Sequence, residues 1–217
     1  MYYIKDIYEN KIVIQKSEFI GILYPITMDT DISTLINDAK KRYPKATHYC
    51  SAYIRGKNAE YASANDDGEP SRTAGVPILE ILKAHNLTDC LCVVVRYFGG
   101  IKLGSGGLIR AYSNAAKEVV KIADIYKRIL ASHYLVKMPY SLIDRFEYAI
   151  KDHVTIIQKD YTDIVSYEFT SLEPIDSLLT DMKHEFKEFV ELEKIETFVL
   201  VEQKWITFTL ETKLFVS

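Results

Sequence analysis

The chain has 217 residues, of which 48% are hydrophobic and 12% aromatic, and its formal net charge is −3. This composition excludes a disordered protein, because disordered segments lack the apolar surface that offsets chain entropy. Residues 1–130 carry 18 Lys and Arg against 14 Asp and Glu, whereas residues 131–217 carry 9 against 16. The small positive excess of the first part permits a polyanionic partner but does not require one.

No apolar run approaches the roughly 20 residues of a membrane helix, and the opening MYYIKDIYENK has acidic residues where a signal peptide has a basic segment. We therefore expect a cytoplasmic protein without membrane contact. Cys50, Cys90 and Cys92 cannot all pair and form no CxxC motif. We expect them in the core rather than in a disulfide or metal site, and we predict no metal and no cofactor.

The first elements follow from apolar periodicity. Residues 11–26 predict two strands, and the helical spacing that begins near Asp31 predicts a short helix that ends before Pro44. Residues 48–55 alternate as a strand does, and residues 56–65 indicate an exposed connection.

An acidic turn follows at residues 66–72. An EF-hand reading fails because Ala74 stands where the loop requires a bidentate Glu. We expect the turn to lead into a helix near Val76 that is capped by Ser71 or Thr73. A structural or partner-contacting role is favoured over acid–base chemistry. The charged members of the turn are Asp66, Asp67, Glu69 and Arg72.

The run CLCVVVRYF at residues 90–98 is almost continuously apolar, which is typical of a strand covered on both faces. Arg96 ends this run, and we expect it to pair with a carboxylate of the acidic turn. His48, at a strand edge, is expected to be satisfied by a hydrogen bond.

Five of the nine glycines lie between Gly99 and Gly107. A Walker motif fails because Ser105 and Gly106 stand where Lys and Ser or Thr are required, and a dinucleotide motif fails because Ile109 replaces its third glycine. A nucleophile elbow fails because the residues around Ser105 are out of register. A helix is predicted from about Gly107 to Ile122, and its first N–H groups, with Lys102 and Arg110 nearby, suit a phosphate or carboxylate. Close helix-to-strand packing is the compatible alternative. The candidate loop residues are Gly99, Gly100, Gly104, Ser105, Gly106 and Gly107.

Four motifs stand out in this region: DDGEP at residues 66–70, VVRYFGG at 94–100, KLG at 102–104 and GGLIRAY at 106–112. Together they resemble the signature of the IMPACT family, in its YigZ-like bacterial branch, over residues 1 to about 125. Arg72 departs from the family pattern, in which a small residue is usual.

The resemblance implies an α+β fold of two domains. Residues 1–126 would resemble domain 2 of a small-subunit ribosomal protein, which is related to the fourth domain of elongation factor G. Residues 127–217 would form a ferredoxin-like domain similar to the last domain of that factor.

The periodicity of the second half independently predicts the order βαββαβ. We expect strands at residues 129–138, 154–158, 164–169, 197–201 and 205–210. We also expect one helix that is capped by Ser141 and a second helix over residues 175–189.

The resemblance also implies a role in translation control under nutrient stress. Eukaryotic members oppose activation of the amino-acid-starvation kinase, partly through an additional N-terminal domain, so that mechanism should not transfer whole. We therefore expect a non-enzymatic binding protein whose partner is the ribosome, RNA or a translation-associated protein. Lys102 and Arg110 would contact its negative charge. The alternative is a metal-assisted hydrolase in which His48 and the carboxylates of the acidic turn surround the glycine-rich loop.

Overall fold

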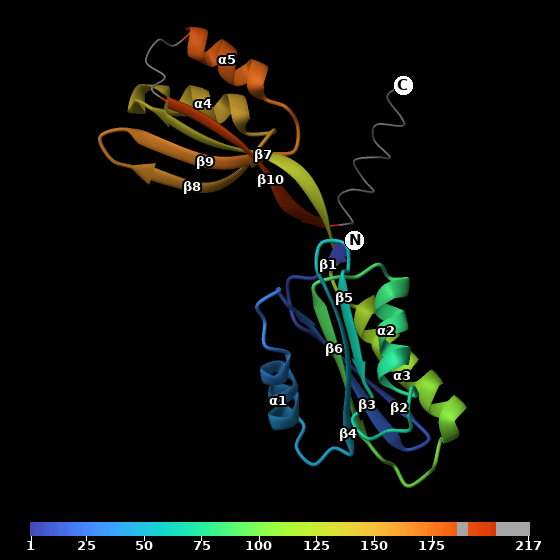
Figure 1. Ribbon diagram of the computed structural model, residues 1–217. Helices are drawn as coiled ribbons and strands as arrows, with labels where there is room; N and C mark the ends of the chain where they lie inside the picture. The colour runs from blue at the N-terminus through green and yellow to red at the C-terminus, as the bar shows by residue number, and fades with distance from the viewer. Residues whose placement is uncertain (186–190, 203–217) are drawn as a thin grey trace. The chain divides into compact units, whose positions relative to one another are not determined.

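The computed structural model describes residues 1–185 and 191–202. Its mixed α+β architecture contains two five-stranded sheets and five α-helices within these residues. The chain divides into two compact units, which are described separately (Figure 1). The first contains Met1–Lys127 with Val201 and Glu202, and the second contains Arg128–Leu200. None of the helices in the described residues is both long and apolar enough to cross a membrane.

The sheet of the first unit is antiparallel throughout, with the order β2-β3-β6-β4-β5. The predicted strands are found at β2 (Tyr8–Ile14), β3 (Ser17–Pro25), β4 (His48–Arg55) and β6 (Cys90–Tyr97). The short strand β1 (Tyr2–Tyr3) lies outside this sheet and pairs with Tyr126 and Lys127.

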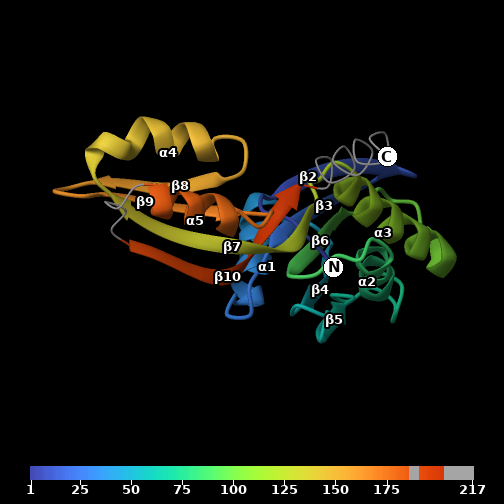
Figure 2. The same ribbon diagram turned by 90° about the horizontal axis from the view of Figure 1, so that it is seen from above.

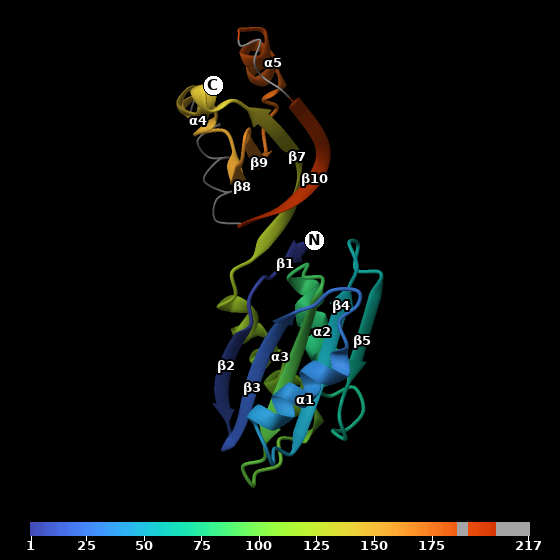
Figure 3. The same cartoon turned by 90° about the vertical axis from the view of Figure 1, so that its left-hand side faces the viewer.

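Strand β6 is central and is covered on both faces, as its apolar run predicted (Figure 3). Cys90, Cys92 and Val94 face the core shared with α2 (Gly75–Ala84) and α3 (Gly104–Lys121). Leu91, Val93 and Val95 face the opposite core, which includes Ala39 of α1 (Ile32–Arg42). The strand therefore holds the sheet between two helical layers. All three cysteines are buried and free, as expected.

The predicted connection at residues 56–65 is wrong in part. Its last five residues form strand β5 (Tyr61–Asn65), which pairs with β4 at the edge of the sheet. All five side chains are exposed, so the strand buries no apolar face that would have produced an alternating pattern in the sequence.

The second unit has the predicted order βαββαβ. Strand β7 (Tyr126–Met138) is followed by the short 3₁₀ turn Tyr140–Leu142 and α4 (Ile143–Ile150), then β8 (Thr155–Tyr161), β9 (Val165–Ser171), α5 (Asp176–Glu185) and β10 (Glu191–Glu202).

The second sheet has the order β10-β7-β9-β8, with β10 alongside β7 (Figure 2), and β1 is its fifth strand through its pairing with the start of β7. Helices α4 and α5 share one core with alternate residues of β7 and β9. Ser141 is not the cap of α4, because the 3₁₀ turn precedes the helix and Leu142 occupies the cap position. The strand expected at residues 205–210 and the end of the helix expected at 175–189 lie outside the described residues.

Gly21 allows α3 to lie close to β3. A Cβ at this position would lie 2.8 Å from the backbone oxygen of Ala115 and 3.1 Å from Val119 Cγ1. We expect Gly21→Ala to lower the free energy of unfolding by about 1–3 kcal/mol, because a backbone atom cannot move aside without shifting the helix. Urea denaturation followed by circular dichroism measures this change.

Gly106→Ala is the matched control. Its added Cβ would have only Arg110 Nη1 within 4 Å, at 3.8 Å, and alanine favours a helix by about 0.5–1 kcal/mol over glycine. Equal unfolding midpoints for Gly21→Ala and the wild type would contradict the close-packing interpretation.

Candidate functional site

Asp66 organises the start of α2. Its carboxylate accepts hydrogen bonds from the N–H groups of Arg72 at 2.8 Å, Ala74 at 3.0 Å and Gly75 at 2.8 Å. The predicted cap by Ser71 or Thr73 is therefore wrong: the residue at the cap position, Ala74, has no capping side chain. The Thr73 hydroxyl instead donates to the Pro70 carbonyl at 2.6 Å. The carboxylate reaches the helix from the other end of the turn.

Asp67 ties the same turn to β4. Its carboxylate accepts from the Tyr49 N–H at 2.7 Å, and its carbonyl lies 2.8 Å from His48 Nδ1. Asp67 has a φ of +44°, and Gly68 follows with a φ of +83°. The Cys50 thiol donates to the Asp66 carbonyl at 3.0 Å, and burial raises the pKa of this thiol to about 12, so it stays protonated.

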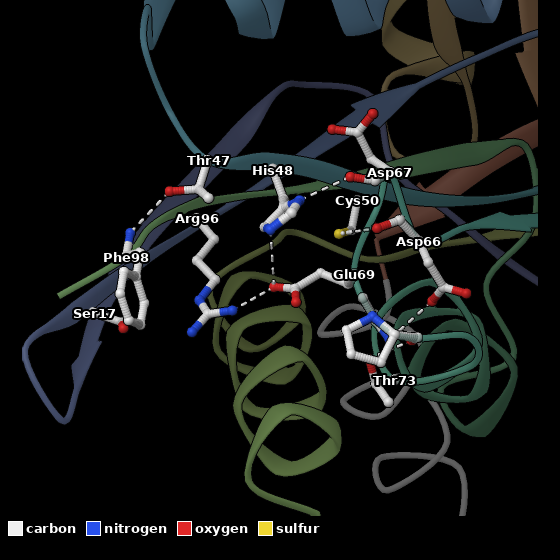
Figure 4. A network of polar contacts seen from close by, with 12 residues as sticks. Ser17, Thr47, His48, Cys50, Asp66, Asp67, Glu69, Thr73, Arg96 and Phe98 are labelled. Atoms are coloured by element: carbon white, nitrogen blue, oxygen red, sulfur yellow. Dashed lines mark hydrogen bonds and ion pairs between the residues drawn. The ribbon is translucent and has the colours of Figure 1, made fainter. Parts of the chain in front are cut away.

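Glu69 is the carboxylate of the turn that pairs with Arg96. Arg96 Nη1 lies 2.5 Å from Glu69 Oε1, and the two residues are 5% and 9% exposed. The Tyr112 hydroxyl donates to the same oxygen at 2.7 Å. His48 Nε2 lies 3.9 Å from this oxygen (Figure 4). Burial, with the neighbouring Cys50 and Glu69, raises the pKa of Tyr112, which keeps it a donor. The expected ion pair is thus confirmed for Glu69.

The strand register explains why these groups meet. Phe19 and His48 lie opposite Arg96 on the two neighbouring strands, so the three side chains form a row on one face of the sheet. That face is covered by α2 and α3, so a charge at the end of β6 points toward Tyr112 of α3 and not to solvent. The row also brings the Arg96 guanidinium 5.4 Å from the centre of the Phe19 ring.

The carboxylates of the turn do not converge. Asp66 is satisfied by backbone N–H groups, Asp67 by the Tyr49 N–H, and Glu69 by Arg96 and Tyr112. No group of three or more His, Cys, Asp or Glu side chains in the described part of the chain could hold a metal ion. The geometry that the hydrolase alternative required is therefore not present there. Arg72 is exposed, and it contacts Asp66 through its backbone N–H.

The glycines of the loop have two different roles. Gly99 packs against β3: a Cβ there would lie 2.0 Å from the Lys16 carbonyl group, and its N–H donates to Ser17 Oγ at 3.1 Å. Gly100 and Gly104 have nothing within 4 Å of an added Cβ, but their φ angles are +86° and +69°. Close packing is therefore observed at Gly99 and a positive φ angle at Gly100 and Gly104, and anion binding by the loop stays a prediction.

Helix α3 begins at Gly104, three residues before the predicted start. No side chain caps it and its first turn contains no acidic residue, so the positive end of the helix dipole is not neutralised locally. Gly104, Ser105 and Gly106 are exposed, and Gly107 is half-buried. Arg110 is exposed one turn further along, where its Nη1 would lie 3.8 Å from a Cβ at Gly106.

A cavity of about 330 Å³ lies between the acidic turn and the start of α3. Of the predicted site residues it brings together Glu69, Arg96, Lys102, Gly104 and Ser105, but not Arg110 or Arg72. Lys102 therefore lines the cavity and Arg110 does not, and the expectation that both contact a negatively charged partner stays a prediction. The cavity is completed by Thr47, His48, Pro70, Phe98, Leu103 and Leu108.

Phe98 was not singled out by sequence reasoning. Its N–H donates to Thr47 Oγ1 at 3.1 Å, and its ring lies 5.5 Å from the Arg96 guanidinium (Figure 4). An aromatic residue at the end of an apolar strand resembles any core residue in the sequence. Only its exposure of 47% marks it as part of a surface.

The Asp66 cap generates a pH-dependent prediction. Burial opposes ionisation of Asp66, but the hydrogen bonds from Arg72, Gly75 and Ala74 outweigh it and lower the pKa of the carboxyl. Its contribution to stability is therefore complete above the unfolded pKa of about 3.9 and is lost as the pH falls through the lower, folded pKa. We expect Asp66→Asn to cost about 0.5–2 kcal/mol at pH 7. The difference from wild type should shrink below about pH 4.

Urea denaturation at pH 7 and at a series of acidic pH values measures this difference. Asp29→Asn, at an exposed position of the same unit, is the control and should have little effect. A cost for Asp66→Asn that stays constant through the acidic range would contradict the cap.

The buried ion pair generates a second prediction. Arg96→Met would leave the Glu69 carboxylate buried without its cation, and we expect a loss of about 3–5 kcal/mol in the free energy of unfolding. The double variant Glu69→Gln, Arg96→Met removes both charges and should recover part of this loss. Urea denaturation of the three variants in this double-mutant cycle measures the coupling. Additive losses would show that the two side chains stabilise the fold independently.

Comparison with known proteins agrees with the motifs. Residues 15–120 match the Impact N-terminal domain. The IMPACT family member YvyE of Bacillus subtilis (strain 168) is 43% identical over 149 residues, which cover 69% of each protein. The IMPACT family member YigZ of Escherichia coli (strain K12) is 30% identical over 136 residues, which cover 62% of this chain and 67% of YigZ.

A solved structure described as the crystal structure of an hypothetical protein shares the fold. It has a TM-score of 0.56 and 24% identity, and the alignment covers 89% of this chain and 95% of that one. The motifs around the cavity and the two bacterial relatives lead to the same conclusion: this chain belongs to the IMPACT family.

Proposed function

We propose that this protein is a non-enzymatic binding protein that acts on the translation machinery. Its partner would be the ribosome, RNA or a translation-associated protein, and the contact would serve regulation under nutrient stress. Membership of the IMPACT family supports a role in translation control, which the resemblance of the motifs implied. The geometry supports binding over catalysis, because each carboxylate of the acidic turn already has its own structural partners.

The observation that carries this proposal is the chemistry at the start of α3. Lys102 lines the cavity and has no hydrogen-bond or ion-pair partner within the described residues. The exposed glycines beside it leave the first N–H groups of the helix accessible. These groups together suit a negatively charged partner, since a helix N-terminus attracts anions. Arg110 would extend the contact along the exposed side of α3.

The two compact units support a two-domain organisation with a boundary near residue 126. We propose that residues 1–126 form a domain like the fourth domain of elongation factor G. We further propose that residues 127–217 form a ferredoxin-like domain. The sheet order β10-β7-β9-β8 and the connection order βαββαβ support the second assignment.

Ribosome co-sedimentation tests the proposal. We expect the double variant Lys102→Ala, Arg110→Ala to bind ribosomes more weakly than wild type at low salt. If both side chains contact phosphates, the slope of log affinity against log salt should fall by about two. Lys41→Ala with Lys117→Ala removes the same charge from exposed positions away from the cavity and is the matched control.

Unchanged co-sedimentation of the Lys102 and Arg110 double variant at low salt would overturn the proposed contact. Capture from starved cells, with and without RNase, then separates an RNA partner from a protein partner. Loss of the captured material after RNase treatment indicates RNA.

A further inference from the structure

We infer that the cavity between the acidic turn and α3 binds one phosphorylated nucleoside, either free or as a unit of an RNA strand. The inference rests on the proposed function, because it names the ligand class of the same surface. Three features of the cavity carry it: a buried guanidinium with unused donors, positive charge without a local counter-ion, and apolar walls that include an exposed aromatic ring.

Arg96 is a buried side chain whose donors are only partly used. Glu69 occupies Nη1, whereas Nε has no hydrogen-bond partner within the described residues. The remaining terminal nitrogen points away from Glu69 in Figure 4, and Arg96 lines the cavity. An unsatisfied donor of this kind is costly to bury, since the net penalty is about 1–3 kcal/mol. Nε itself is fully buried, so it is the remaining terminal nitrogen, also without a partner within the described residues, that could donate to an anion in the cavity.

The plane of this guanidinium is held before any ligand arrives. Its carbon lies 5.4 Å from the centre of the Phe19 ring and 5.5 Å from the centre of the Phe98 ring. Aromatic rings at these distances attract a cation through their negative faces. Because Phe19 and Glu69 are both buried, the guanidinium cannot turn toward solvent without breaking these contacts. The donor is therefore preorganised toward the cavity.

The charge balance of the cavity favours an anion. Arg96 neutralises Glu69, and Lys102 adds a positive charge that has no partner within the described residues. The uncapped start of α3 at Gly104 and Ser105 faces the same space. Lysine, a guanidinium and helix N–H groups line the same cavity, and together they suit the several acceptor oxygens of a phosphate group.

The walls indicate that the ligand is larger than a bare phosphate. Phe98, Leu103, Leu108 and Pro70 make much of the lining apolar, and a phosphate alone would leave them in contact with water. The volume of about 330 Å³ lies at the lower end of the range of about 300–1,000 Å³ for small-ligand pockets.

Phe98 provides a stacking surface for a base. The residue is 47% exposed although Arg96 lies against its ring, and its backbone N–H is held by the hydrogen bond to Thr47. Stacking on an aromatic side chain tolerates any base, because each base has a π face. The cavity would therefore distinguish nucleotides from other anions better than it distinguishes one base from another.

The experiment is a titration of the full chain with AMP, GMP, CMP and UMP. Binding is measured by calorimetry and by the NMR signals of the backbone amides. Adenosine and guanosine, inorganic phosphate, and a short peptide with a free C-terminal carboxylate are titrated in parallel. We expect the nucleotides to bind at least about tenfold more tightly than the nucleosides or phosphate. A nucleoside lacks the charge-assisted hydrogen bonds of the phosphate, and phosphate lacks the stacking of the base.

Matched variants locate the site. Lys102→Ala should weaken AMP binding about tenfold, and Phe98→Leu should do the same because it keeps apolar bulk but removes the ring. Phe98→Trp should retain binding. Lys117→Ala removes the same charge from an exposed position on α3 roughly 20 Å away along the helix and should leave binding unchanged.

A short RNA probe distinguishes the sources of the nucleotide. A 5′-phosphorylated dinucleotide that binds more tightly than AMP indicates a unit of an RNA strand, and the reverse order indicates a free nucleotide. The inference is overturned if the nucleotides bind no more tightly than phosphate, if the peptide binds more tightly, or if Lys102→Ala and Phe98→Leu have no effect. Ribosome co-sedimentation that persists in that case leaves the proposed function intact.

Discussion

The ion pair between Arg96 and Glu69 is the interaction on which the rest of the first unit's functional face depends. It joins the end of the central strand to the acidic turn, and the hydroxyl of Tyr112 attaches α3 to the same carboxylate. Two charges are stable in this buried position because each has a partner and further hydrogen bonds or ring contacts. One contact therefore sets the positions of β6, the turn and the helix.

The acidic turn is a structural device rather than a reactive centre. Asp66 caps α2 and Asp67 holds the turn on β4, so the negative charges that dominate this motif in the sequence are used within the fold. The positive groups next to them are not used in this way: Lys102 and the first turn of α3 have no acidic partner within the described residues. The acidic turn therefore borders a cavity in which the groups without partners are hydrogen-bond donors.

The fold also explains why the glycine-rich loop needs its composition. Gly99 lies against the backbone of β3, which leaves no room for a side chain, and Gly100 and Gly104 adopt positive φ angles that other residues rarely take. This path returns the chain from the end of β6 to the start of α3 beside the acidic turn. The inferred nucleotide site depends on this path of the loop, because the path places Lys102, Arg96 and Phe98 around the same cavity.

Much of this protein is determined by local patterns in its sequence. The apolar run of β6 and the order βαββαβ follow from periodicity. Strand β5 could not be recognised, because an edge strand with no buried face leaves no pattern.

The cavity was decided only by the tertiary structure. Which carboxylate would meet Arg96 depended on the path of the turn, and the cap of α2 came from Asp66 across that turn and not from an adjacent residue. The fold placed Lys102 in the lining of the cavity without Arg110 and left Phe98 exposed. The physical reason is that periodicity reports which residues are buried within an element, whereas a site depends on distances between side chains from different elements.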